Sequence, residues 1–172
     1  LKVKKYFLLI IFFLLFASKS YSNNYTFTKI IELDEPWGSS FINNNEIIIT
    51  EKSGKIKIVN VVSKKVTEIK HNLNFLVVGQ GGLLDIIHQG NTIWVSYSEN
   101  RGVSKTSTSI AKAQLNKQEL DFKNIFQANP PIDSGYHFGS RLAIKGDFIY
   151  ASAGERGQGM IAQDPTKHPG SI

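Results

Sequence analysis

Two side chains in the last third of the chain could form an acid–base pair. His137 precedes Phe138-Gly139, which opens one predicted strand, and Glu155 follows a second predicted strand at 147–152. Histidine is the usual general base near neutral pH, and a neighbouring carboxylate fixes its tautomer and raises its basicity. The sequence therefore predicts a proton acceptor beside a carboxylate. A structural histidine and a solvated surface pair between Glu155 and Arg156 remain the alternatives.

A glycine-rich segment, Gly79-Gln80-Gly81-Gly82, opens an earlier predicted strand at an equivalent place. Glycine lets the backbone approach its neighbours closely, and the amide of Gln80 offers one acceptor and two donors. The pattern fits a ligand contact and also fits a tight turn before a strand. It does not predict a phosphate-binding loop, because no helix follows it. The other histidines, His71, His88 and His168, are predicted to be surface or turn residues.

The composition excludes some kinds of site and partner. The chain has no cysteine, which excludes thiolate metal sites and cysteine nucleophiles. The net charge is +6, but segment 1–22 holds four lysines and no acidic residue, so the remainder carries only +2. That remainder has no basic stripe, and we therefore predict no nucleic-acid partner.

The first 22 residues have the pattern of a secretory signal. A basic start is followed by an unbroken apolar run of eleven residues at 6–16 and then by small and polar residues, with cleavage expected near Ser20 or Ser22. Eleven residues make a helix of roughly 16 Å, which is about half of the hydrocarbon thickness of a bilayer. We predict a signal peptide over 1–22, a periplasmic or secreted protein, and membrane contact only through this export signal. An uncleaved membrane anchor is the alternative.

Beyond the signal, the elements that must position these residues are short strands. Runs rich in β-branched and aromatic residues lie between clusters of glycine, asparagine, aspartate and serine, which predicts an all-β fold. Three units open alike, with a glycine, an apolar-rich strand, a turn and a second strand, and the first two units continue with two more strands. The predicted strands cover 37–42, 46–50, 55–59, 65–69, 82–87, 92–97, 108–115, 122–126, 139–144 and 147–152.

Four strands per unit, with opening glycines 44 and 57 residues apart, predict the blades of a β-propeller. A β-sandwich is the alternative, but it does not require the same opening three times. Propellers have four to eight blades of about 40–45 residues. Residues 23–172 hold about two and a half such units, so we expect them to be the N-terminal part of a propeller domain that is truncated at the C-terminus. An open propeller exposes strand edges, and the piece alone should be poorly stable.

An ordered set of segments from about residue 30 onward resembles the soluble PQQ-dependent aldose sugar dehydrogenases (PQQ is pyrroloquinoline quinone), which are grouped with the soluble quinoprotein glucose dehydrogenases. The segments are Pro36-Trp-Gly38, Ile49-Thr-Glu-Lys-Ser-Gly54, Gly79-Gln-Gly-Gly-Leu-Leu-Asp85, Ile93-Trp-Val-Ser-Tyr-Ser-Glu99, His137-Phe-Gly-Ser-Arg-Leu142, Ala153-Gly-Glu-Arg156, Ala162-Gln-Asp164 and His168-Pro-Gly-Ser-Ile172. The resemblance implies a six-bladed propeller, of which this chain would hold the first two and a half blades.

The resemblance also implies roles. His137 falls on the general base that takes the proton of the sugar's anomeric hydroxyl, while hydride passes from C1 to PQQ and leaves a lactone. Glu155 falls on the carboxylate that supports this histidine, and Gln80 on a side chain that contacts the cofactor. Calcium is implied as well, but its ligands and the other PQQ contacts are expected downstream of Ile172, so no metal ligand is predicted here.

The resemblance therefore implies that the parent is an enzyme, an oxidoreductase acting on aldoses, and that this piece alone is inactive. Its electron acceptor, a quinone or a cytochrome, stays unspecified. The alternative function is a non-catalytic secreted propeller that binds glycans or proteins.

Overall fold

The structure is a computed structural model that describes residues 25–172, and the regular structure in that part is β-strand apart from one 3₁₀ turn, η1 (Gly159–Gln163). The first sheet has the order β1-β2-β3-β4-β8, the second β5-β6-β7-β9 and the third β10-β11. The strands are β1 (Pro36–Asn43), β2 (Glu46–Glu51), β3 (Ile56–Asn60), β4 (Val66–His71), β5 (Leu83–Gln89), β6 (Thr92–Asn100), β7 (Thr106–Gln114), β8 (Glu119–Leu120), β9 (Lys123–Gln127), β10 (Gly139–Lys145) and β11 (Phe148–Ala153).

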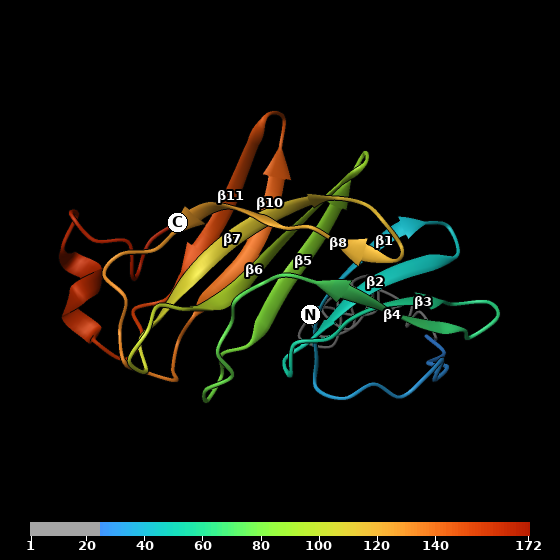
Figure 1. Cartoon of the computed structure of the whole chain (residues 1–172), viewed down its shortest axis with the longest axis horizontal. Coiled ribbons are helices and arrows are strands. Elements are labelled where there is room, and N and C mark those ends of the chain that lie inside the picture. Colours follow the sequence, from blue (N-terminus) through green and yellow to red (C-terminus); the bar gives the residue numbers. More distant parts are fainter. Residues whose placement is uncertain (1–24) are drawn as a thin grey trace, which may run out of the picture.

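The three sheets lie one after another with their first strands adjacent, from teal through green to orange in Figure 1. In each of the first two sheets, a side-chain hydroxyl on the second strand donates a hydrogen bond to the next sheet. Thr50 Oγ1 donates to the carbonyl of Leu84 at 2.5 Å, and Ser96 Oγ donates in the same way to the carbonyl of Ser140 at 2.7 Å. Successive antiparallel sheets joined through their first strands are blades, so the structure confirms an all-β partial propeller rather than a sandwich.

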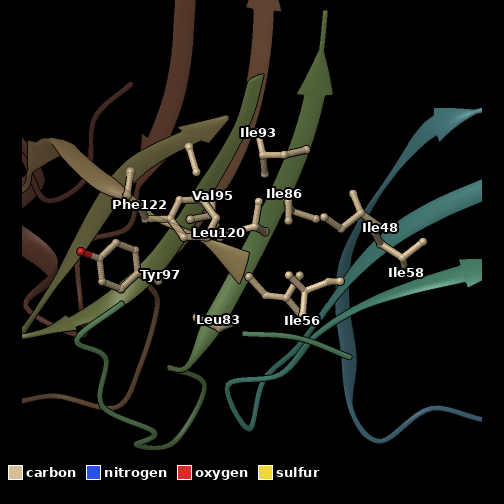
Figure 2. Packing of buried hydrophobic residues seen from close by; sticks show 13 residues of the cluster. Ile48, Ile56, Ile58, Leu83, Ile86, Ile93, Val95, Tyr97, Leu120 and Phe122 are labelled. Carbon is tan, nitrogen blue, oxygen red and sulfur yellow. The ribbon is translucent and has the colours of Figure 1, made fainter. Parts of the chain in front are cut away.

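The main core fills the space between the first two sheets (Figure 2). Ile48, Ile56 and Ile58 of the first sheet point toward Ile86 and Ile93 of the second, and all five are at most 4% exposed. Ile48 of β2 and Ile86 of β5 lie next to further apolar residues. In β3 and β6 the apolar residues recur at every second position, so one face of each of these strands is apolar. Burial of this face fixes how the two blades pack, because a slip of one residue would turn the apolar side chains outward.

The three inner hairpins share one irregularity in register. The partners Pro36↔Glu51, Leu83↔Tyr97 and Gly139↔Ala153 are each followed by a shift before regular pairing resumes. Such a bulge re-aims the side chains beside it. The shared register also makes residues of different blades equivalent. The position two residues before β5 corresponds to the position two residues before β10, and the position two residues beyond Tyr97 corresponds to the position two residues beyond Ala153.

All ten predicted strands are present, with bounds that move by up to three residues. The prediction missed β8, a two-residue strand that leaves the second blade and pairs in parallel with β4 of the first. His71 and His88 were predicted to be surface or turn residues, but they lie within β4 and β5, because each strand extends beyond its apolar residues. The predicted signal peptide at 1–22 lies outside the described residues.

Candidate functional site

His137 and Glu155 meet at one end of the third blade, as the sequence predicts. His137 lies two residues before β10 and Glu155 two residues after β11, and antiparallel pairing of these strands brings the two positions together. The imidazole Nδ1 donates to Oε1 of Glu155. Their side chains are 55% and 28% exposed, so the pair is open to solvent on one side. The hydrogen bond from His137 lowers the pKa of Glu155, and the backbone N–H of Gly157 adds to the effect.

The backbone of His137 is held in an unusual conformation. Its φ is +48°, in the left-handed region that non-glycine residues seldom adopt. Its N–H donates to Oε1 of Gln80 at 2.8 Å, and its carbonyl accepts the N–H of Arg156 at 3.3 Å. Gly154 is needed beneath it, since a Cβ there would overlap the carbonyl oxygen of His137. The N–H and the carbonyl of His137 are therefore both held by neighbouring residues.

Gln80 belongs to the same site, because the loop that carries it lies against the loop that carries His137. The backbone N–H of Gln80 donates to the carbonyl of Gly135 at 2.7 Å, while its side-chain oxygen accepts from His137. A Cβ on Gly79 would overlap the same Gly135 carbonyl, so this approach requires glycine. The amide nitrogen of Gln80 has no hydrogen-bond partner within residues 25–172, and the exposed side chain leaves it available to a ligand.

Arg156 is the residue whose place the sequence did not predict. A solvated pair with Glu155 was the alternative, but Arg156 is 2% exposed, and its guanidinium lies 3.6 Å from the centre of the Phe138 ring. Burial lowers the pKa of Arg156 to about 10, so it stays charged at neutral pH. The surface-pair alternative is therefore wrong for Arg156. No local pattern distinguishes a buried arginine from an exposed one.

A cavity of about 370 Å³ lies beside the first strands, next to the loop of His137. Its lining is Pro36, Trp37, Asp85, Gly139, Ser140 and Arg141. Arg141 donates to Oδ1 of Asp85 at 3.0 Å, although its own side chain is 76% exposed. The buried Asp85 also accepts the N–H of Leu142 at 2.8 Å, so it ties the second blade to the third.

The other histidines make structural contacts. His71 Nε2 bonds with the carbonyl of Gly54 at 2.7 Å, and His88 Nδ1 lies 3.3 Å from the carbonyl of Phe41. His168 Nδ1 accepts the N–H of Asn129 at 2.9 Å. In the part of the chain that the structure describes, no three His, Cys, Asp or Glu side chains are grouped so that they could hold a metal ion.

The family of this chain follows from comparison with known proteins. The sequence profile of the glucose/sorbosone dehydrogenases matches residues 33–172, which is most of the chain. The chain belongs to the glucose/sorbosone dehydrogenase family. This family membership agrees with the resemblance found in the sequence motifs.

Relatives of known structure give the same family. The chain is 30% identical to the aldose sugar dehydrogenase YliI of Escherichia coli K12 over 151 residues, which is 82% of this chain and 41% of that protein. The crystal structure of the apo soluble aldose sugar dehydrogenase from Escherichia coli superposes with a TM-score of 0.75 at 31% identity, covering 80% of this chain and 43% of that one. The chain thus spans about two fifths of the length of these relatives.

A more distant structure shares the fold. It is the PQQ-bound form of an aldose sugar dehydrogenase from Streptomyces coelicolor, with a TM-score of 0.67 at 21% identity, covering 81% of this chain and 43% of that one. At this identity the likeness concerns the fold alone. Within residues 25–172 of this chain, no helix is long and apolar enough to cross a membrane.

Proposed function

We propose that the protein carrying this chain oxidises aldose sugars at C1 to lactones with PQQ as the hydride acceptor. The observation that carries the proposal is the convergence of His137, Glu155 and Gln80 from three separate segments at one solvent-open place. Membership in the glucose/sorbosone dehydrogenase family supports it, whereas nothing in the comparisons favours a non-catalytic glycan- or protein-binding propeller.

The pair is arranged for proton transfer. Glu155 accepts from Nδ1, which leaves Nε2 as the unprotonated ring nitrogen of a neutral imidazole. Within residues 25–172 this Nε2 has no hydrogen-bond partner, and the side chain is 55% exposed, so a sugar hydroxyl can reach it. His137 then removes the proton of the anomeric hydroxyl, and Glu155 stabilises the imidazolium that results. The electron pair of the O–H bond forms the carbonyl as C1 loses its hydride.

The residues present fit a PQQ molecule on one side. When bound, PQQ supplies the hydride-accepting quinone, and the protein supplies placement and the base. The unused amide N–H groups of Gln80 suit the carbonyl and carboxylate oxygens of such a cofactor. Calcium prefers six to eight oxygen ligands. We place its ligands and the remaining cofactor contacts in a longer form of the protein, outside these residues.

We also propose that the protein is exported to the periplasm or beyond the cell, on the strength of the signal pattern at 1–22. Residues 23–172 alone should be inactive, since they supply one wall of the site. The electron acceptor that reoxidises the cofactor is proposed to be a quinone or a cytochrome.

The test is turnover of the natural protein at its full length. The purified protein is loaded with PQQ and calcium, and dye reduction is followed with a panel of aldoses while the sugar product is identified by NMR. We expect aldose-dependent dye reduction with a lactone as the first product. Failure of every aldose to reduce the dye, in a preparation that binds PQQ stoichiometrically, would exclude the proposed activity.

A further inference from the structure

Arg156 is a buried cation that forms none of the ion pairs found among residues 25–172. A buried charge without a counter-ion is costly unless neutral groups solvate it. Here neutral oxygens and one aromatic ring do so. An apolar residue of similar volume could fill the same space without such contacts. The contacts that the guanidinium makes therefore indicate what the charge does.

The guanidinium joins two segments that are far apart in sequence. On one side, Nη1 donates to the carbonyl of Thr106 at 3.1 Å and Nη2 to its hydroxyl at 2.7 Å, at the start of β7. On the other side, Nε donates to the carbonyl of Tyr136 at 2.9 Å, and Nη2 also bonds to the carbonyl of Ser134. The second segment is the loop that carries His137.

These contacts surround His137 without touching its ring. The residue before it is held through its carbonyl, its own carbonyl accepts the backbone N–H of Arg156, and the ring of Phe138 lies against the guanidinium. Two consecutive residues after β11 thus hold His137: Glu155 holds its imidazole, and Arg156 holds its backbone. The left-handed φ of +48° at His137 is a conformation that needs such support.

We propose that Arg156 is a positioning residue for the general base: it fixes the 134–138 loop so that the imidazole of His137 faces Glu155 and the sugar. This rests on the proposed function, because it assumes that His137 removes the proton. The planar guanidinium is required, since its fixed fork of donors serves three carbonyls and a hydroxyl that lie in different directions. The ammonium of lysine is a compact point charge that cannot span them.

A merely structural role would predict a different result. If Arg156 only joined the second blade to the third, its loss would lower the unfolding temperature, while the folded fraction kept its kcat. A positioning role predicts a lower kcat at unchanged KM and faster hydrogen exchange in the 134–138 peptide, with β6 and β7 still protected. A misplaced reacting group costs up to about 10²-fold in rate.

The experiment compares Arg156→Lys and Arg156→Met with Arg101→Met in the full-length, PQQ-loaded protein. Arg101 is the matched control because it also donates to a residue at the start of β7, Ser107, at 3.1 Å, but its hydrogen bonds and ion pair within residues 25–172 do not involve the 134–138 loop. We expect both Arg156 variants to lose roughly 10–100-fold in kcat with KM and PQQ binding retained, and Arg101→Met to keep its kcat. A folded Arg156→Lys protein with wild-type kcat would overturn the proposal.

Two further measurements keep the test decisive. If Arg156→Met does not fold, Thr106→Val removes one acceptor of the guanidinium, and we expect a smaller kcat loss with the same exchange pattern; unchanged exchange at 134–138 overturns the proposal. If the wild-type protein oxidises no aldose, the proposed function fails by itself. Exchange of the 134–138 peptide in Arg156→Lys then still reports whether Arg156 holds the loop.

Discussion

Two carboxylates occupy equivalent places in neighbouring blades and have opposite surroundings. Glu99 lies two residues beyond Tyr97, which pairs with the first residue of β5. Glu155 lies two residues beyond Ala153, which pairs with the first residue of β10. The side chain of Glu99 is 10% exposed, whereas that of Glu155 is 28% exposed and accepts from the imidazole of His137. The strand register is the same, but the backbone before the first strand differs, because His137 has a φ of +48° and Gly81 lies outside the left-handed region. The difference between the two carboxylates therefore lies in the loop conformation and in the side chains that meet each of them.

The carboxylate of Glu99 is fully occupied by neutral hydrogen-bond donors, and the guanidinium of Arg101 lies 3.9 Å from its Oε2. Ser109 Oγ, Asn124 Nδ2 and Gln127 Nε2 donate to it at 2.7–2.8 Å, from β7 and β9. Tyr97 donates to Asn124 in the same cluster, and burial, with the nearby charge of Glu99, raises the pKa of Tyr97 to about 12. Such a satisfied network fixes the outer strands of the second blade and leaves no lone pair for a substrate.

The position that corresponds to His137 in the second blade is Gly81, two residues before β5. A Cβ on Gly81 would lie 2.7 Å from the ring of Phe138, which comes from the third blade. An imidazole therefore has no room there, and Glu99 meets amides instead. The two blades share a strand register, but the carboxylate forms part of a candidate reactive site only where a solvent-open histidine faces it.

The largest expected effect comes from removing the base. His137→Ala in the full-length PQQ-loaded protein should lower kcat by about 10²–10⁴-fold, because the substitution removes the proposed proton acceptor. The unfolding temperature should change little, since the side chain is exposed. His88→Gln is the matched control and should keep its kcat. Steady-state dye reduction checks both, and wild-type turnover in His137→Ala would remove the histidine from the mechanism.

Glu155→Gln tests the open half of the comparison. The amide keeps the shape but cannot stabilise an imidazolium, so kcat should fall by about 10²-fold while the unfolding temperature is nearly unchanged. The measurement is kcat together with thermal unfolding of the same preparation. A loss of stability without a loss of kcat would make Glu155 a structural residue like Glu99.

Glu99→Gln tests the buried half, and the expected result is the reverse. The amide NH₂ would face donor groups from Asn124 and Gln127, leaving buried polar atoms unpaired at a cost of about 1–3 kcal/mol. The free energy of unfolding in urea should fall by that amount, with kcat unchanged in the folded protein. If turnover fell while stability stayed the same, the division of roles between the two carboxylates would be wrong.

The strands and the pair at the site could be predicted because local features determine them. Short runs rich in β-branched and aromatic residues between turn residues mark the strands. The same glycine-then-strand opening in three units places His137 beside Glu155 once the third unit is interpreted as a hairpin. The structure confirms the fold and the proximity of these residues and of Gln80. Their chemical roles stay predictions.

The features that could not be predicted depend on pairing between distant segments. Strand β8 is two residues long and exists because Lys70 and His71 offer free backbone groups to Glu119 and Leu120. Arg156 is buried because Thr106 and the 134–136 carbonyls converge on it from two blades. Neither contact leaves a periodic pattern or a turn signal in the sequence near it.

The smallest expected effect is a shift in the titration of Glu155. The hydrogen bond from His137 holds the pKa of Glu155 below its ordinary value of 4.5. Because the folded value is the lower one, the contact stabilises the folded loop above pH 4.5 and is lost as the pH falls through the folded value. Carboxyl carbon NMR of the full-length protein should show a midpoint for Glu155 below 4.5. In His137→Ala, which lacks the imidazole, the midpoint should rise toward 4.5, and an equal midpoint in both proteins would show that the two side chains are not paired in solution.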